Sequence, residues 1–238
     1  MAAITPLRSS SGREPRGPGR PRISGRTVTT GTAREEILDQ AARLFTEHGY
    51  SATSTRDIAE ACGVRQASLY YHFAGKHEIL AVLLGMTVRP SRDKVEEIEG
   101  EATPENVETA LYLLALVDIY TLARAPHNVA ILGQLPDVVS AGDGEIYADF
   151  QAERRELVAA YTTFGYRIAQ HNGAAVTPEG LGAMLIQLVE GVIPARAEGG
   201  DIDDERAHEI ASGCLRLCGC DQEQIDAARS RAEELHDQ

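Results

Sequence analysis

The sequence predicts an all-α protein with a small N-terminal domain of three helices followed by a larger helical domain. Apolar residues recur at helical spacing after residue 31, and no segment alternates for long with the two-residue period of a strand. Proline and glycine divide this pattern into separate helices. A length of 238 residues suits two domains. We therefore expect an arm over residues 1–31, a first domain over residues 32–84 and a second over residues 85–238.

The arm is rich in Ser, Gly, Pro and Arg, and its six arginines stand beside one acidic residue, Glu14. It lacks apolar periodicity, which predicts a disordered basic segment. It also lacks the apolar core of a secretory signal. The longest uninterrupted apolar run of the chain, Ala110 to Val117, is far too short to cross a bilayer. We expect a cytoplasmic protein without membrane contact.

The first helix is predicted between Thr32 and Gly49. Thr32 and Glu35 have the spacing of a capping box, in which each residue binds the backbone N–H of the other. Ile37 and Phe45 belong to one apolar face. Gly49 follows as the residue that ends the helix.

Three further helices follow at short intervals. The second begins at Ser54 or Thr55 and ends at Gly63, the third covers about Arg65–Phe73, and the fourth opens near Lys76. Two short helices joined by a tight turn at Gly63 are typical of a helix-turn-helix.

Helical runs separated by breakers fill the rest of the chain. Pro90 is expected to end or kink the fourth helix, and Pro104 suits the first turn of the next one. The helices expected beyond Pro90 are 104–124, a short piece between Pro126 and Gly142–Gly144, 145–171, 178–197 with an interruption at Pro194, 203–217 and 222–235.

The net charge of −13 is divided unevenly. Residues 1–80 carry 11 basic and 8 acidic side chains, whereas residues 81–238 carry 12 basic and 28 acidic ones. This asymmetry favours a chain that presents its N-terminal end to nucleic acid and holds the other end away.

The segment Thr53–Leu80 closely resembles the DNA-binding domain of the TetR family of bacterial regulators. The shared elements are Thr55, Ile58-Ala59, Gly63-Val64, Leu69-Tyr70, His72-Phe73 and Lys76. The resemblance implies a DNA-binding domain over residues 32–84 and a ligand-binding and dimerisation domain after about residue 85. It further implies a transcriptional regulator, most often a repressor, that binds pseudo-palindromic double-stranded operator DNA as a homodimer and is released by a small-molecule effector.

The third helix is expected to read DNA. Leu69 and Phe73 are four residues apart and can pack against the first two helices, which leaves the polar side chains free. Gln66 can pair with an adenine edge, and Arg65 with guanine or a phosphate. Arg65 stands where many family members have Ser or Thr, which removes a side-chain N-cap.

The DNA-binding residues expected in this domain are Thr55, Arg65, Gln66, Ser68, Tyr70, Tyr71, His72 and Lys76. By resemblance, Thr55, Tyr71, His72 and Lys76 contact phosphates, which set position without reading sequence. Ser68 and Tyr70 are expected at the DNA backbone or a base edge. For Tyr70 and His72, the alternative to DNA contact is that the side chain packs in the core of the domain.

The arm contains Gly19-Arg20-Pro21-Arg22, which is similar to the minor-groove segment of AT-hook peptides. Arginine favours the narrow, strongly negative minor groove of A-tracts. Either Arg20 and Arg22 enter this groove, or the arm is a tail with nonspecific attraction to DNA.

The helices at 178–197 and 203–218 resemble the pair that forms a four-helix interface with a second subunit. Their apolar stripes comprise Met184, Leu185, Leu188, Val189 and Val192 on the first and Ile210, Cys214, Leu217 and Cys218 on the second.

A ligand pocket is expected around Asp118, because this carboxylate interrupts the apolar run Leu111–Leu122. A buried carboxylate needs a partner, either a ligand or a protein group such as an arginine. The residues expected to bind the ligand are Asp118, Tyr112, His127, Tyr161 and Gln187; further candidates are Tyr120, Gln134, Tyr147, Phe150, Phe164, Tyr166 and Glu190. A wall rich in tyrosine would suit an aromatic or hydroxylated molecule.

An alternative to a small-molecule effector is redox or metal sensing by a cluster of three cysteines, Cys214, Cys218 and Cys220. No matching Cys/His pair completes a tetrahedral site, so packing in a helix is the other interpretation. An effector-free DNA-binding protein is a third hypothesis. The sequence predicts no cofactor, no metal site and no catalytic residue, because it lacks the spacing of a nucleophile and its base.

Overall fold

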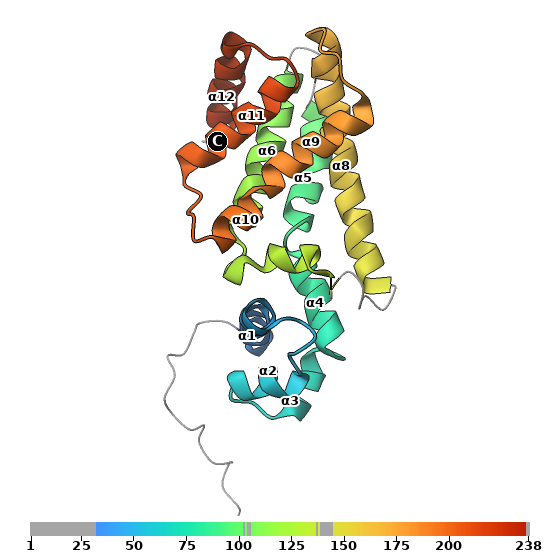
Figure 1. The fold of residues 1–238 in the computed structure, drawn as a ribbon, viewed down its shortest axis with the longest axis vertical. Helices are drawn as coiled ribbons and strands as arrows, with labels where there is room; N and C mark the ends of the chain where they lie inside the picture. The colour runs from blue at the N-terminus through green and yellow to red at the C-terminus, as the bar shows by residue number, and fades with distance from the viewer. Residues whose placement is uncertain (1–31, 102, 104–105, 137, 139–144, 237–238) are drawn as a thin grey trace, which may run out of the picture. The chain divides into compact units, whose positions relative to one another are not determined.

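The computed structural model describes residues 32–101, 103, 106–136, 138 and 145–236, which are helical with short connections (Figure 1). No strand occurs within these residues, as the sequence predicts. Arg20 and Arg22 lie outside the described residues.

The N-terminal domain contains α1 (Ala33–His48), α2 (Thr55–Ala61) and α3 (Gln66–His72). Capping boxes are present at the starts of α1 and α2, the first of them made by Thr32 and Glu35 as predicted. Gly49 adopts a φ of 91°, which L residues rarely reach, and its N–H binds the Phe45 carbonyl at the end of α1. The helix ends are thus set by hydrogen bonds between residues close together in the sequence.

The connection to the larger domain differs from the expectation around Pro90 by one additional helix. Helix α4 (Lys76–Gly85) already ends before this proline, and a separate helix α5 (Arg89–Glu101) begins there. Pro90 lies in the first turn of α5, where a missing N–H costs no helical hydrogen bond. The fourth helix thus ends shortly before Pro90, as predicted, and the proline also helps to start α5, a helix that the sequence did not predict.

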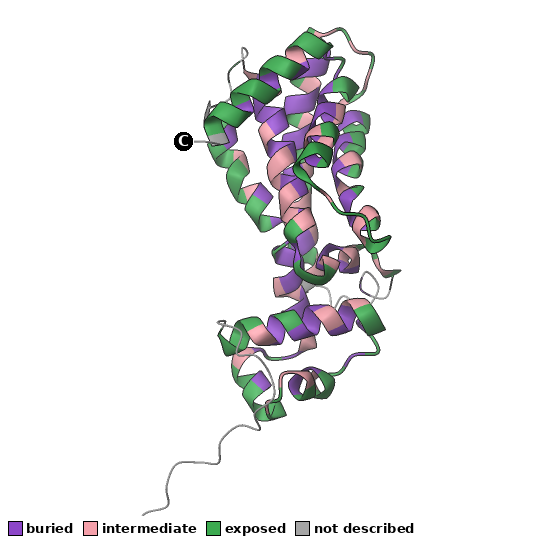
Figure 2. Cartoon of the chain, turned by 90° about the vertical axis from the view of Figure 1, so that its left-hand side faces the viewer, coloured by how far each residue is buried: buried purple, intermediate pink, exposed green. Residues whose placement is uncertain are grey.

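The larger domain is built around α6 (Val107–Arg124), which contacts α5, α8, α9, α10, α11 and α12. The helices around it begin and end close to the predicted residues. Their bounds are η1 Pro126–Gln134, α8 Glu145–His171, α9 Pro178–Glu190, α10 Val192–Ala197, α11 Asp204–Leu217 and α12 Gln222–His236. Figure 2 shows buried positions on the faces that these helices turn toward one another.

Helices α8 and α9 approach closely at Gly165. A Cβ atom at this position would lie 2.5 Å from Leu185 Cδ1, so a larger residue would push the helices apart. Gly165 thus sets the distance between α8 and α9, two of the helices that surround the cavity described below.

The segment from Pro178 to Ala197 is long and apolar enough to span a membrane by length and composition. Core helices pass the same test, so this is weak evidence for a span. Glu190 lies within the segment and forms an ion pair with Arg154 of α8, which is consistent with a core helix.

A strained connection links α6 to η1. His127 and Asn128 have φ values of 52° and 51°, a left-handed conformation that is unfavourable for most L residues but tolerated by Asn and His. Helix η1 in turn contacts α1 and α4. This connection therefore lies between the larger domain and the helix-turn-helix.

Candidate DNA-binding surface and ligand cavity

Helix α3 has one buried and one exposed face. Leu69 and Phe73 are buried, as predicted, and hold α3 against α1 and α2. Tyr71 is 87% exposed and Tyr70 is 51% exposed. Arg65, Gln66 and Ser68 are exposed as well. The outward face of α3 is thus a polar and aromatic surface for which the residues that the structure describes supply no apolar partner.

A small hydrogen-bonded cluster orders part of this surface. Gln66 Nε2 donates to Thr55 Oγ1 over 2.9 Å, and Thr55 Oγ1 lies 3.3 Å from the Tyr70 hydroxyl. The three side chains join the start of α2 to α3. This arrangement restrains the Gln66 amide on the protein surface.

Lys76 is engaged by the protein rather than free. Its ammonium donates to the carbonyl oxygens of Tyr50, Ser51 and Thr53 over 2.8, 3.4 and 2.9 Å. It also lies 4.4 Å from the centre of the Tyr50 ring. Lys76 thus fixes the turn between α1 and α2, and the structure places its ammonium on protein groups rather than in open solvent.

His72 is half-buried, and its ring lies 5.2 Å from that of Tyr71 in an edge-on arrangement. Such contacts are favourable for aromatic rings. His72 can therefore orient Tyr71.

Arg65 occupies the N-cap position of α3 and makes no capping hydrogen bond through its side chain. We expect Arg65→Ser to raise the free energy of unfolding by about 1 kcal/mol, because serine caps the helix. The same change is expected to weaken DNA binding and to flatten its salt dependence by roughly one ion per half-site. Urea denaturation and a salt titration of DNA affinity measure the two effects. Unchanged salt dependence would remove Arg65 from the DNA contacts.

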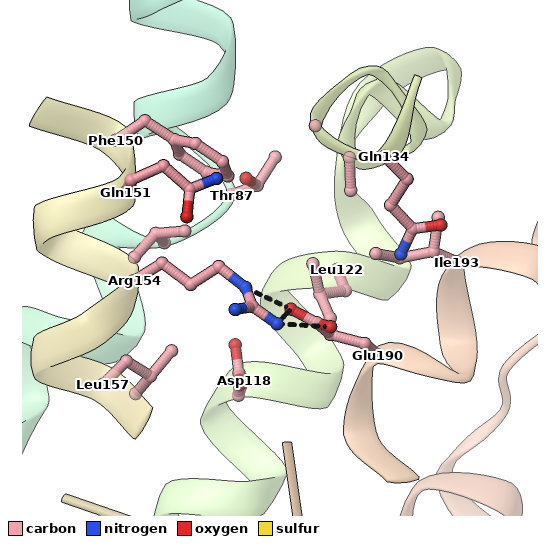
Figure 3. A pocket seen from close by; sticks show the side chains of 13 residues that line it. Thr87, Asp118, Leu122, Gln134, Phe150, Gln151, Arg154, Leu157, Glu190 and Ile193 are labelled. Carbon is pink, nitrogen blue, oxygen red and sulfur yellow. Dashed lines mark hydrogen bonds and ion pairs between the residues drawn. The ribbon is translucent and has the colours of Figure 1, made fainter. Parts of the chain in front are cut away.

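A cavity of about 220 Å³ lies in the larger domain between α6, α8, α9, α10, η1 and the turn that joins α4 to α5 (Figure 3). It is lined by Thr87, Val88, Asp118, Leu122, Ala130, Gly133, Gln134, Phe150, Gln151, Arg154, Leu157, Glu190 and Ile193. Its lining includes one aromatic ring, that of Phe150. Three charged side chains lie among apolar ones, so the cavity combines a polar end with apolar walls.

Asp118 is 2% exposed and accepts two hydrogen bonds from hydroxyl groups. Ser91 Oγ donates over 2.9 Å from α5, and the Tyr161 hydroxyl donates over 3.2 Å from α8. The pKa of Asp118 is raised from 3.8 to about 7, chiefly by burial and also by the nearby Glu190, while the hydrogen bonds from both hydroxyls and the charge of Arg154 oppose the shift. Asp118 can therefore gain or lose a proton near neutral pH.

Arg154 and Glu190 form a two-point ion pair across the cavity. Arg154 Nε and Nη2 donate to the Glu190 carboxylate over 2.7 and 2.8 Å. Figure 3 shows the Arg154 guanidinium pointing to Glu190, while Asp118 points toward the same pair from α6. Glu190 raises the pKa of Arg154, which remains charged.

Comparison with known proteins places the chain in a family. The family model described as "Bacterial regulatory proteins, tetR family" matches residues 37–83, which contain α2, α3 and most of α1 and α4. A crystal structure of AmtR from Mycobacterium smegmatis is 37% identical with a TM-score of 0.73, and the match covers 89% of this chain and 97% of AmtR. The chain belongs to the TetR family. The resemblance noted in the sequence is thereby confirmed.

Two curated relatives of this TetR-family chain are named as repressors. The HTH-type transcriptional repressor KstR2 of Mycobacterium tuberculosis is 49% identical over 51 residues, which are 21% of this chain and 26% of KstR2. The HTH-type transcriptional repressor ComR of Escherichia coli is 25% identical over 190 residues, 77% of this chain and 88% of ComR. The chain thus spans about a quarter of KstR2 in this match.

Of the five residues predicted to bind a ligand, Asp118 lines the cavity and Tyr161 donates a hydrogen bond to Asp118. The other three lie elsewhere. The Tyr112 hydroxyl lies 2.7 Å from His208 Nδ1. His127 Nε2 lies 2.9 Å from Asp39 Oδ1 of α1. Gln187 is exposed on α9. The further candidates Gln134, Phe150 and Glu190 line the cavity.

Sequence reasoning did not single out several polar residues at this site, namely Thr87, Ser91, Gln151 and Arg154. They come from the α4–α5 turn, α5 and α8, whose register against α6 no local pattern reveals. The sequence analysis expected an arginine as a possible partner of Asp118 but did not say which one. The arginine near Asp118 is Arg154, and it pairs directly with Glu190 instead.

A wider groove of about 780 Å³ lies along another face of α6. Leu113, Leu116 and Val117 contribute to its apolar lining. Its polar groups are largely engaged with one another: the Tyr120 hydroxyl donates to Asp204 over 3.1 Å, and the Arg124 guanidinium lies 4.7 Å from the centre of the Tyr120 ring. The groove therefore has apolar surface that a ligand could cover, but its carboxylates, Asp204 and Glu233, are exposed, whereas Asp118 in the smaller cavity is buried.

The apolar stripes of α9 and α11 divide into two sets. Five of the predicted members are buried within the chain itself: Leu185, Val189, Val192, Cys214 and Cys218. The others keep exposed area, with Met184 at 41% and Leu217 at 37%, and Leu188 and Ile210 are partly exposed. We call these four residues the α9–α11 face.

The cysteines lie in apolar surroundings. Cys214, Cys218 and Cys220 are buried, and burial raises the pKa of Cys214 to about 12 and that of Cys220 to about 11. The reactive thiolate form is therefore scarce at neutral pH. Among the described residues, no group of three His, Cys, Asp or Glu side chains could hold a metal ion. These observations favour packing over redox or metal sensing.

Proposed function

We propose that this TetR-family chain is a ligand-responsive transcriptional repressor that acts in the cytoplasm. The observation that carries the proposal is the outward face of α3, whose polar and aromatic side chains are exposed while Leu69 and Phe73 anchor the opposite face. A helix so presented can enter the major groove and place Gln66 at base edges, with Thr55, Ser68, Tyr70, Tyr71, His72, Arg65 and Lys76 toward the DNA backbone.

Two copies of the chain would bind one operator. In a two-fold dimer the reading helices stand about 34 Å apart, one turn of the duplex. The α9–α11 face supports this arrangement, because its exposed apolar side chains gain by burial against a second copy. Leu188 and Gly213 lie close together between these helices, since a Cβ on Gly213 would be 3.1 Å from Leu188 Cδ2.

We expect Met184→Glu with Leu217→Glu to convert the dimer to a monomer. Both side chains are already exposed in the single chain, so folding should survive while charges repel across the interface. Sedimentation velocity measures the mass. Leu235→Glu is the matched control, because Leu235 is 45% exposed on α12 outside this face. A dimer that persists in the double variant would place the interface elsewhere.

The cavity is joined to the helix-turn-helix by hydrogen bonds. Arg196 Nη1 donates to the Leu122 carbonyl over 2.7 Å and to Asn128 Oδ1 over 3.3 Å, and Asn128 Nδ2 donates to the Ile193 carbonyl over 2.9 Å. Leu122 and Ile193 line the cavity. The neighbouring His127 binds Asp39 of α1. Displacement of the cavity wall by a ligand would therefore move η1 and α1, which shifts the population of DNA-binding conformations.

Asn128→Gly is expected to keep operator binding and ligand binding while weakening the effect of one on the other. Glycine tolerates the left-handed backbone at this position but lacks the carboxamide that binds Arg196 and Ile193. Operator affinity with and without ligand measures the coupling. Asn106→Gly, at the opposite end of α6, is the control. A full ligand response in Asn128→Gly would show that the signal takes another route.

Transcription in a purified system tests the proposed function. The template carries a promoter overlapped by a duplex sequence that the chain enriches from a random library. Added chain is expected to lower transcript yield, and a releasing ligand to restore it. Higher yield on addition of the chain would contradict a repressor.

A further inference from the structure

We propose that the cavity binds a small organic cation, a protonated amine on a compact apolar body, with Asp118 as its counter-ion. This inference rests on the proposed function only for the claim that the bound cation changes operator affinity. Binding of the cation itself can be measured without DNA.

The charges of the cavity are not balanced within the protein. Its charged lining residues are Asp118, Arg154 and Glu190. Arg154 and Glu190 neutralise each other through their two hydrogen bonds. Asp118 has hydroxyl donors in Ser91 and Tyr161 but forms no ion pair with the residues that the structure describes. A buried carboxylate without a cation is costly, and a ligand ammonium would supply the missing charge.

An anionic ligand fits this site poorly. It would meet an Arg154 guanidinium whose charge Glu190 already neutralises, and it would bring a further negative charge beside Asp118 and Glu190. A negative charge on the ligand would be repelled by both of these carboxylates, and the repulsion is strong in a buried site because little water screens it. The charge arrangement therefore selects for a cation.

The remaining lining fixes the size and polarity of the ligand body. Leu122, Phe150, Leu157 and Ile193 provide apolar walls, and the volume of about 220 Å³ is below the usual range for drug-sized ligands. The Phe150 ring can also attract a cation that approaches its face. A ligand with a single ring or a short branched chain and one amino group can pack against the apolar walls and pair with the Asp118 carboxylate.

Proton and ligand compete for the same carboxylate. The groups that face Asp118 are Ser91 from α5, Tyr161 and Arg154 from α8, Glu190 from α9 and Cys214 from α11. Since the pKa of Asp118 is about 7, affinity for a protonated amine should rise with pH by up to about tenfold per unit below this value and level off above it. A neutral ligand would show no such rise.

Three probes of similar shape test the proposal on the purified protein by calorimetry: cyclohexylamine, cyclohexanol and cyclohexanecarboxylate. At about pH 8 we expect the amine to bind at least about tenfold more tightly than the alcohol, because an ionic hydrogen bond forms in a dry site. The amine should lose this advantage in Asp118→Asn. The matched control is Asp204→Asn, which makes the same chemical change in the wider groove and should leave amine binding unaltered.

Tighter binding of the carboxylate than of the amine would overturn the proposal, as would no binding of the amine at millimolar concentration. Amine affinity that is equal in wild type and Asp118→Asn would overturn it too, and loss of binding in Asp204→Asn would assign the ligand to the wider groove. If the amine binds through Asp118 but operator affinity does not change, the cation site stands and the effector step of the proposed function fails.

Discussion

The double variant Gln66→Ala, Tyr71→Ala is expected to lose specific operator binding by at least about 100-fold. A bidentate contact between an amide side chain and adenine contributes about 1–3 kcal/mol of discrimination, and a dimer makes it in two half-sites. Loss of Tyr71 removes a phosphate contact that sets the position of α3. Nonspecific affinity should fall much less, because Arg65 and Lys76 keep their charges.

The fold should tolerate these changes, since Gln66 and Tyr71 are exposed. Fluorescence anisotropy with an enriched duplex and a scrambled duplex separates specific from nonspecific affinity, and sedimentation checks that the dimer persists. Gln170→Ala on α8 is the control, because Gln170 is also exposed but lies outside the DNA-binding domain. Wild-type specificity in the double variant would contradict the proposed contacts.

Asp118→Asn is expected to stabilise the protein at about pH 8 by roughly 2–4 kcal/mol. In wild type the folded state holds the Asp118 proton more tightly than the unfolded state, since the pKa rises from 3.8 to about 7. Stability contributed by this group therefore falls as the pH rises from about 4 to about 7 and is constant above that. Asparagine stays neutral, and both hydroxyl partners can still hydrogen-bond to it, because a hydroxyl donates or accepts.

The difference between the two proteins should thus be small near pH 4 and reach its full size above pH 7. Urea denaturation at several pH values measures it, with Asp204→Asn as a control that changes an exposed carboxylate. A difference that does not depend on pH, or lower stability of Asp118→Asn at about pH 8, would contradict the picture of a buried carboxylate without a cation.

Helix positions followed from the sequence where local chemistry decides them. The capping box of Thr32 and Glu35 and the breakers that bound residues 145–171 placed helices at the positions observed. Helix α5 was missed because its start has no cap signal and its composition is highly charged, and because Pro90 was taken to end a helix rather than to begin one.

The site was predictable only in part, because it depends on the register between helices. Asp118 was recognisable as the one carboxylate in the apolar run Leu111–Leu122. Its hydroxyl partners Ser91 and Tyr161 are 27 and 43 residues away, and no spacing rule reaches that far. Tyr112 is six residues before Asp118, so it projects from a different side of α6 and binds His208 instead.

The α9–α11 stripes illustrate the same limit. Their apolar residues recur at helical spacing on both the inward and the outward side, so the pattern identified the helices without separating core from surface. Burial in the folded chain makes that separation, and it leaves Met184, Leu188, Ile210 and Leu217 as the face available to a second copy.

Selection from a library of random duplexes tests the central claim that α3 reads operator DNA in a two-fold dimer. The account predicts enrichment of a sequence with two related half-sites whose centres are about 10 base pairs apart or a multiple of the helical turn. It further predicts that about 5 base pairs inserted between the half-sites abolish tight binding, because the second reading helix then faces the wrong side of the duplex. Enrichment of no sequence, or of an undivided site whose affinity survives the insertion, would contradict it.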